Sequence, residues 1–367
     1  MTQERSQLVL VLGSGGVGKT SCSASLGLGL AESGLKAVVI TIDPAKRLAQ
    51  ALGLESLSNE AQKIIDFENG GSMDALWLDN KSAFTDLIHR KISTPGLAEK
   101  ILNNRLFKII QEQLGGIEEY LAVDKLLTLG NSGEYDICIL DTPPSRHALD
   151  FLESPEHLLK FFDESVLKLF LKEDESEAKK SGFWNKLFTS TRAQTLEIFK
   201  RFLGQGFMGE LSSLLSESRP VHQSLRETAQ GVKEWVRQDN TKSILVSLPE
   251  SYPIEEARLL SSELRAHELH KADLLILNRT LPDSPFPQGP EFERYLGKEA
   301  TADLKERHKS QQNVIESISS DSQSIANATI QIAPFSHAEM GLPMLRSLGK
   351  DILNKWKSQD QTSFSKT

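Results

Sequence analysis

The stretch Leu8-Val-Leu-Val-Leu-Gly13-Ser-Gly-Gly-Val-Gly-Lys19-Thr20 joins five apolar residues to a glycine-rich turn and then to a helical pattern that runs to about Ser33. The turn fits G-x-x-x-x-G-K-[ST] at every fixed position. In this pattern the glycines let backbone amides turn inward around phosphate oxygens, the lysine neutralises phosphate charge, and the hydroxyl binds Mg²⁺. A strand before it and a helix after it are the context that the pattern requires. The stretch therefore predicts a phosphate-binding loop at the end of a buried strand, and Gly34 is expected to close the helix.

Further apolar runs predict the rest of the fold. Short strands are expected at residues 37–42, 75–78, 137–140, 243–248, 274–277 and 330–333, with helical patterns between them. Continuous apolar runs of this length are typical of parallel strands that are covered on both faces. The sequence thus predicts an α/β fold with a doubly wound, mostly parallel sheet of the P-loop NTPase type.

Two stretches between the expected strands are too long for simple crossovers. Residues 84–131 and 151–240 are predicted to be helical insertions in a single domain that spans residues 1–358. Residues 359–367 are polar and are expected to form a flexible tail.

Composition excludes several classes of protein. The formal net charge of -8 argues against nucleic acid as a partner, because such proteins usually need a basic surface. The apolar run 8–12 is too short for a signal peptide or a membrane span, so a cytoplasmic protein is expected. Cys22 and Cys138 are far apart and form no Cys-x-x-Cys pair, which predicts reduced, structural thiols and no zinc site.

Two aspartates follow expected strands at their carboxyl ends, where ligands bind in open α/β sheets. Asp141 follows the run 137–140 and is predicted to support a Mg²⁺ site together with Thr20. Asp43 follows the run 37–42 and is suited to orient an attacking water near a γ-phosphate, beside the same metal. Each aspartate taken alone could equally be a helix N-cap or a turn residue.

At this point the sequence resembles the ArsA-type ATPases. The likeness rests on the loop 13–20, on Thr41-Ile-Asp-Pro-Ala45 as a switch I segment, and on Asp141-Thr-Pro-Pro-Ser-Arg-His147 as a switch II segment. It extends to Gly115-Gly-Ile-Glu-Glu119, to Asn278, to Ala333-Pro-Phe335 and to Gly341-Leu-Pro343, and so covers residues 8 to about 350. The resemblance implies an ATPase that binds Mg·ATP and works as a homo- or heterodimer.

The resemblance also implies roles for single residues. The nucleotide would be held by Gly13, Ser14, Gly15, Gly16, Val17, Gly18, Lys19, Thr20 and Ser21, with Asn278 on the adenine and Pro334 and Phe335 covering the base. Thr20, Asp43 and Asp141 would form the metal site. Lys19, Asp43 and Asp141 would carry the hydrolysis, which would serve either to handle a hydrophobic client or to energise a membrane anion carrier.

The sequence departs from the family's pattern at the phosphate site. Ser14 stands where the family usually has a lysine that reaches the partner subunit's phosphates, and Arg146 stands where a glycine is usual. Our hypothesis is that Arg146 supplies the missing cation, with Lys46 or Arg47 as weaker candidates; an ordinary surface arginine is the alternative. The family's arsenite-binding cysteines and dimer-bridging zinc cysteines have no counterparts, so neither metalloid binding by thiolates nor zinc is expected.

Aromatic residues are concentrated in the second insertion. Residues 151–217 hold nine of the chain's sixteen phenylalanines, several of them at helical spacing. These stripes could pack as core, or they could form a groove for a hydrophobic client helix or a membrane-protein partner. An ATPase switch is the leading interpretation of the whole chain. A low-turnover ATP-binding scaffold, acting as half of a heterodimer with a related chain, is the alternative that Ser14 keeps open.

Overall fold

A computed structural model of the chain describes residues 5–42, 47–78, 80–92, 96–104, 117–143, 149, 219–267, 269–281, 293–294, 297–319, 325–334, 341–359 and 364. The chain divides into two compact units. The first consists of residues 1–79, 125–149 and 234–367, and the second of residues 80–124 and 150–233. The expected insertions, 84–131 and 151–240, overlap the second unit.

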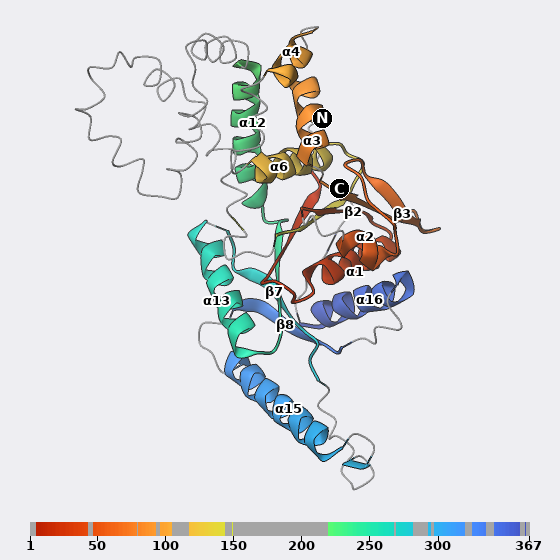
Figure 1. Ribbon diagram of the computed structural model, residues 1–367, viewed down its shortest axis with the longest axis vertical. Coiled ribbons are helices and arrows are strands. Elements are labelled where there is room, and N and C mark those ends of the chain that lie inside the picture. Colours follow the sequence, from red (N-terminus) through yellow and green to blue (C-terminus); the bar gives the residue numbers. More distant parts are fainter. Residues whose placement is uncertain are drawn as a thin grey trace, which may run out of the picture. The chain divides into compact units, whose positions relative to one another are not determined.

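The first unit is built on an eight-stranded sheet with the order β3-β4-β2-β5-β1-β6-β7-β8 (Figure 1). Its strands are β1 (Gln7–Leu12), β2 (Lys36–Thr41), β3 (Gln62–Asp66), β4 (Ser72–Trp77), β5 (Ile137–Asp141), β6 (Lys242–Ser247), β7 (Ala272–Asn278) and β8 (Ala326–Ile332). All neighbours pair in parallel except β3, which is antiparallel to β4. The predicted doubly wound, mostly parallel sheet is therefore confirmed.

One strand was not expected, and other strands begin earlier than predicted, β4 by three residues and β8 by four. β3 was not expected, because its residues are exposed or half-buried and show no buried face. It forms an edge strand by folding back on β4 through the turn 67–71, where the amide of Phe67 bonds the carbonyl of Gly71. β8 begins at Ala326, four residues before its expected start. There polar residues alternate with buried ones, as suits a strand at the sheet's edge.

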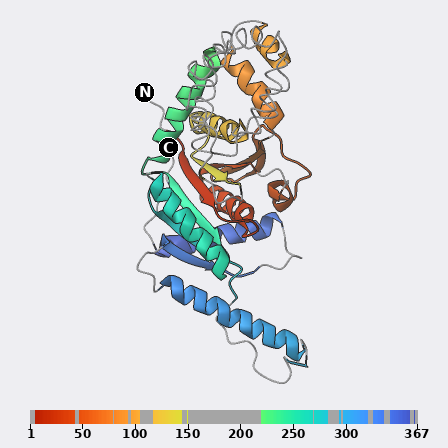
Figure 2. The ribbon, with the colours of Figure 1, turned by 60° about the vertical axis from the view of Figure 1, so that its left-hand side comes forward.

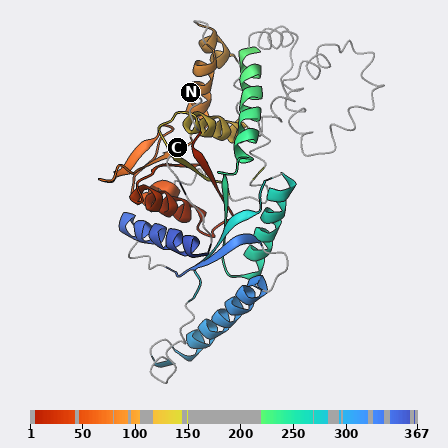
Figure 3. The same cartoon turned by 180° about the vertical axis from the view of Figure 1, so that it is seen from behind.

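Helices cover both faces of this sheet. The described helices that lie wholly within the first unit are α1 (Lys19–Glu32), α2 (Arg47–Leu52), α13 (Ser251–Ala266), α15 (Lys298–Ser319) and α16 (Leu342–Gln359). α1 and α16 lie side by side on one face of the sheet and α13 lies on the other (Figures 1 and 3). In Figure 2, α13 lies in front of the strands. Gly34 follows α1 in the left-handed region, and its amide bonds the carbonyl of Ala31, which confirms it as the residue that closes the helix.

The contact between α1 and α16 is made backbone to backbone. A Cβ on Gly349 of α16 would lie 2.0 Å from the carbonyl oxygen of Ser25, and one on Gly29 of α1 would lie 2.8 Å from the carbonyl carbon of Gly349. Around these glycines Leu348, Ile352 and other apolar residues of α16 pack into the core that α1 shares with the sheet. The helix α1, which follows the phosphate loop directly, is thus packed closely against a second helix.

Replacing Gly349 with alanine is expected to destabilise the protein by about 1–3 kcal/mol, because the added methyl group forces two packed helices apart. Thermal and denaturant unfolding would measure the loss. The matched control is Ser347→Ala, an exposed position on the same helix, which should change stability little. A Gly349→Ala variant that unfolds like the wild type would contradict the close helix contact.

An ion cluster joins the ends of the same two helices. Glu32 accepts hydrogen bonds from Nη2 of Arg346 and Nζ of Lys350, both at 2.8 Å. Arg346 also lies over the ring of Phe67, 5.0 Å from its centroid. The hydrogen bonds from Arg346 and Lys350 hold the pKa of Glu32 below its ordinary value of 4.5.

This pKa shift gives a pH dependence of stability. A carboxyl whose pKa is lower in the folded state stabilises the protein fully above its unfolded pKa, and this contribution is lost as the pH falls through the folded pKa. Compared with Glu32→Gln, the wild type should be more stable at neutral pH, and the difference should shrink below about pH 4.5. Denaturant unfolding of both proteins across this range is the measurement. A difference that stays constant in acid would show that the charge of Glu32 does not contribute.

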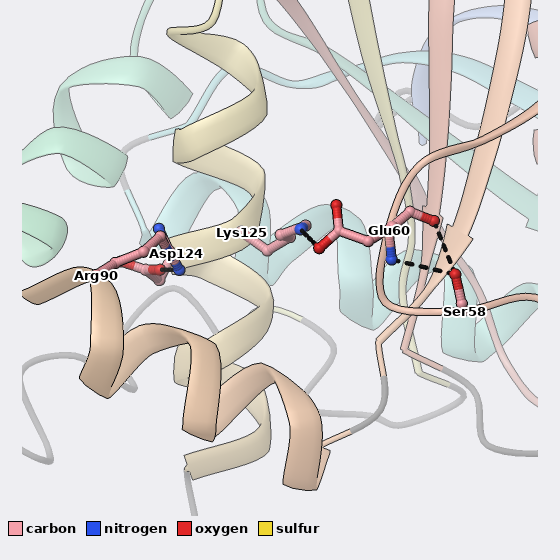
Figure 4. Close-up of polar contacts among 5 residues, drawn as sticks. All are labelled: Ser58, Glu60, Arg90, Asp124 and Lys125. Carbon is pink, nitrogen blue, oxygen red and sulfur yellow. Dashed lines mark hydrogen bonds and ion pairs between the residues drawn. The ribbon is translucent and has the colours of Figure 1, made fainter. Parts of the chain in front are cut away.

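The described part of the second unit is helical. It contains α3 (Asn80–Lys91), α4 (Leu97–Asn103), most of α12 (Arg219–Val236) and the first half of α6 (Ile117–Gly130). The buried carboxylate of Asp124 accepts hydrogen bonds from Nη2 of Arg90 at 2.6 Å and from Oγ1 of Thr228 at 3.4 Å. One acidic side chain therefore joins α3, α6 and α12; Figure 4 shows its contact with Arg90.

The next residue of α6, Lys125, belongs to the first unit. Its ammonium lies 3.7 Å from the carboxylate of Glu60, whose backbone contacts the hydroxyl of Ser58 (Figure 4).

The aromatic-rich stretch 151–217 lies outside the described residues. Among the described residues, no helix is both long and apolar enough to cross a membrane.

Both cysteines are buried and free. Burial raises the pKa of the Cys22 and Cys138 thiols to about 12, so both stay protonated at neutral pH.

Most of the expected tail, 359–367, lies outside the described residues, although Phe364 packs edge-on against Trp356 with ring centroids 5.4 Å apart.

Candidate functional site

The predicted phosphate loop occupies residues 13–18, between β1 and α1. Its glycines are required by the backbone. Gly16 and Gly18 have φ angles of 80° and 99°, in the left-handed region. A Cβ on Gly13 would lie 2.3 Å from the carbonyl oxygen of Val246 in β6. Because β1 is the strand between β5 and β6, the loop emerges near the middle of the sheet's carboxyl edge, where α/β proteins bind ligands.

Lys19, the first residue of α1, folds back over this loop. Its Nζ donates hydrogen bonds to the carbonyl oxygens of Gly13 at 2.8 Å and Ser14 at 2.9 Å, and the residue is buried. Its positive charge is therefore held inside the turn. The N-terminus of α1 adds amide N–H groups that the helix's own ladder does not use, and its first turn contains no acidic residue. The whole turn is suited to an anion.

Asp141, the last residue of β5, is buried, and its carboxylate accepts hydrogen bonds from hydroxyl groups of two neighbouring elements, α1 and β2. Its Oδ2 accepts hydrogen bonds from Oγ1 of Thr20 at 2.7 Å and from Oγ1 of Thr41 at 3.1 Å. Ser23 lies on its other side, with Oγ at 3.5 Å from Oδ1. The strand register explains the contact, because Asp141 is paired with both Val11 of β1 and Thr41 of β2.

The structure therefore brings Thr20 and Asp141 together, as predicted for a metal site. A threonine hydroxyl and a carboxylate are hard oxygen donors, which Mg²⁺ prefers, and one or two protein oxygens beside substrate phosphates are its usual protein ligands. The donor set thus fits Mg²⁺, and the lysine and glycine loop fits a phosphate chain. Among the residues that the structure describes, no group of three or more His, Cys, Asp and Glu side chains forms a separate metal cluster.

Asn278, the last residue of β7, lies against the phosphate loop. Its Nδ2 donates a hydrogen bond to the carbonyl oxygen of Val17 at 2.8 Å, and its Oδ1 accepts one from the amide of Arg279 at 3.0 Å. Pro334 is exposed and comes two residues after Ile332, the register partner of Asn278. Both residues are therefore at the same end of the β7–β8 pair. Their expected contacts with adenine stay predictions.

Sequence reasoning missed two of these contacts. Ser23 was not singled out, although it follows Thr20 by three residues and so shares a helix face with it. The bond between Asn278 and Val17 joins residues that are 261 positions apart. Three predicted site residues, Asp43, Arg146 and Phe335, lie outside the described part of the chain.

Comparison with known proteins is consistent with this geometry. The ATPase ASNA1 homolog of Babesia bovis is 27% identical over 282 residues, which cover 77% of this chain and 68% of that protein. ATPase GET3B of Arabidopsis thaliana is 25% identical over 366 residues, which cover 94% of this chain and 77% of that protein. ATPase GET3 of Mycosarcoma maydis is 30% identical over 160 residues, which cover 44% of this chain and about half, 46%, of that relative.

The family model of the anion-transporting ATPases matches residues 6–354, which is nearly the whole chain and includes both the phosphate loop and Asn278. With this match, and with the loop geometry around Lys19 and Asp141, the chain belongs to the anion-transporting ATPase family.

Proposed function

We propose that this chain binds Mg·ATP at the loop 13–20 and hydrolyses it to drive a conformational switch. The observation that carries the proposal is the shared acceptor at Asp141. One buried carboxylate receives the hydroxyl of Thr20, next to the phosphate-loop lysine, and the hydroxyl of Thr41, two residues before Asp43. The names of the relatives, all ATPases, support the same reaction.

The residues of the site divide the work. Amide N–H groups of the loop and of the first turn of α1 would hold the β- and γ-phosphates, and Lys19 would neutralise the charge that develops between them. Thr20 and Asp141 would hold Mg²⁺, which when bound supplies Lewis-acid stabilisation of the phosphate oxygens. Asp43 would orient the attacking water. Asn278, Pro334 and Phe335 would bind the adenine.

Asp141 is also placed to report the state of the site. It begins the predicted switch II segment 141–147, and its bond to Thr41 ties it to the strand that enters the switch I segment 41–45. A change at the γ-phosphate would therefore reach both segments through one side chain. We propose that this rearrangement acts on a dimer and on the helical insertions, and that it serves to handle a hydrophobic client helix or to energise a membrane carrier.

A second candidate function rests on Ser14. Its carbonyl accepts a hydrogen bond from Lys19, but its side chain carries no charge to offer a partner subunit. The chain would then be a low-turnover ATP-binding scaffold whose related partner supplies the missing lysine. Phosphate release by the chain alone, compared with release after mixing with a related chain, separates the two functions. Unchanged release by an Arg146→Ala variant would exclude Arg146 as the replacement cation.

An Asp43→Asn variant should keep its affinity for Mg·ATP and lose most of its phosphate release, because an amide with one acceptor oxygen and no charge orients an attacking water less effectively than a carboxylate. Asp66→Asn, at an exposed aspartate of β3, is the matched control. The variant locked with Mg·ATP is also the form with which to capture a client. Phosphate release at the wild-type rate would remove Asp43 from its proposed role.

A further inference from the structure

The side chain of Asn278 has both ends of its amide fixed. Oδ1 accepts from the backbone amide of Arg279, and Nδ2 donates to the carbonyl of Val17 in the phosphate loop. Exchanging the two ends would bring a donor against an N–H group and an acceptor against a carbonyl, so only this orientation satisfies both partners. The residue is buried, with 8% of its surface exposed.

The turn after β7 is shaped around this amide. Arg279 has a φ of 57° and is the one residue other than glycine with positive φ among those that the structure describes. Such a conformation is unfavourable for an L-residue. It is secured by Thr280, whose amide bonds the carbonyl of Ile332 at 2.8 Å and whose hydroxyl bonds the carbonyl of Leu277 at 3.0 Å. The turn holds the Arg279 amide against Oδ1.

On the loop side, the amide packs directly on Gly18. A Cβ at Gly18 would lie 2.3 Å from Nδ2 of Asn278, so only glycine allows the approach. The C=O and N–H of a trans peptide point in opposite directions. Fixing the carbonyl of Val17 on Asn278 therefore directs the N–H of Gly18 away from β7. This peptide comes immediately before Lys19 and the first turn of α1.

From this geometry we infer that Asn278 is a positioning residue of the phosphate loop, beyond any contact with the base. Its amide sets the orientation of the Val17–Gly18 peptide and so supports binding of the phosphate chain whatever base is attached. The inference rests on the proposed binding of Mg·ATP at this loop. It predicts that losing the donor at Asn278 weakens even a ligand that has no base.

The experiment compares Mg·ATP with Mg·tripolyphosphate by calorimetry. Asn278→Asp keeps the side chain's shape and its acceptor for Arg279, but it replaces the donor with an oxygen that faces the carbonyl of Val17. We expect both ligands to bind about 10-fold more weakly, the size of one lost hydrogen bond together with an uncompensated carbonyl. Gln331→Ala, an exposed position on the neighbouring strand β8, is the matched control.

The outcomes are distinct. If Asn278→Asp weakens ATP but leaves tripolyphosphate binding unchanged, Asn278 serves the base alone and the inference is wrong. A wild type that binds ATP but no tripolyphosphate at millimolar concentration would also overturn it. A wild type that binds neither ligand would overturn the proposed function itself. Asn278→Ala, which removes both bonds without adding charge, should also weaken both ligands. Tripolyphosphate binding that is unchanged in this variant would show that the aspartate acts by repelling the phosphates, and would overturn the inference.

Discussion

Replacing Lys19 with alanine is expected to lower the rate of ATP hydrolysis about 1,000-fold, the upper range for removing one preorganised charge donor from a phosphoryl-transfer site. The ammonium is buried and lies 2.8 and 2.9 Å from two carbonyl oxygens of its own loop. The side chain is therefore already ordered, and it loses little conformational entropy when phosphate oxygens of a bound nucleotide take the place of those carbonyl oxygens. Phosphate release at saturating ATP is the measurement.

The matched control for this change is Lys36→Ala, because Lys36 is an exposed lysine at the start of β2, at the opposite end of the strand from the site. It should hydrolyse ATP like the wild type. If Lys19→Ala retained a tenth or more of wild-type phosphate release, the loop would not be the reaction centre. Thermal melting of both variants shows whether the fold is intact.

Replacing Asp141 with asparagine is expected to lower phosphate release about 100-fold and to raise the Mg²⁺ concentration that the reaction needs. The carboxylate accepts the hydroxyls of Thr20 and Thr41 on one oxygen, with Ser23 beside the other. An amide offers one acceptor oxygen in place of two, turns an NH₂ group toward a hydroxyl, and brings no negative charge to a metal. Both the metal site and its link to Thr41 are weakened.

Titration of phosphate release with Mg²⁺ separates these effects. Asp303→Asn, at an exposed aspartate of α15 that pairs with Arg307, is the control for charge loss. It should leave the Mg²⁺ dependence unchanged. An Asp141→Asn variant with the wild-type Mg²⁺ requirement and rate would place the metal site elsewhere.

The phosphate loop could be predicted from sequence because its information is local. Every feature that the turn needs, from Gly13 to Thr20, lies within eight consecutive residues, and the buried strand before it shows as an uninterrupted apolar run. The central strands were recognised for the same reason. β3 could not be recognised, since an exposed antiparallel edge strand needs no apolar pattern and is defined by its pairing with β4.

The contacts that shape the site depend on topology instead. Asp141 meets Thr41 because β5 lies between β1 and β2, an order that no single segment reveals. Asn278 reaches Val17 because β7 lies next to β6, which in turn lies next to β1. Without the family resemblance, Asn278 would have been interpreted as a turn residue. The glycine contact between α1 and α16 joins segments at opposite ends of the chain in the same way.

The most direct test of this account is a calorimetric titration of the purified full chain with ATP, with and without Mg²⁺. We predict saturable uptake at one site per chain that requires Mg²⁺, because Thr20, Lys19 and Asp141 converge on a single loop. Absence of any magnesium-dependent uptake of adenine nucleotide would contradict the assignment of the loop 13–20 as a nucleotide site.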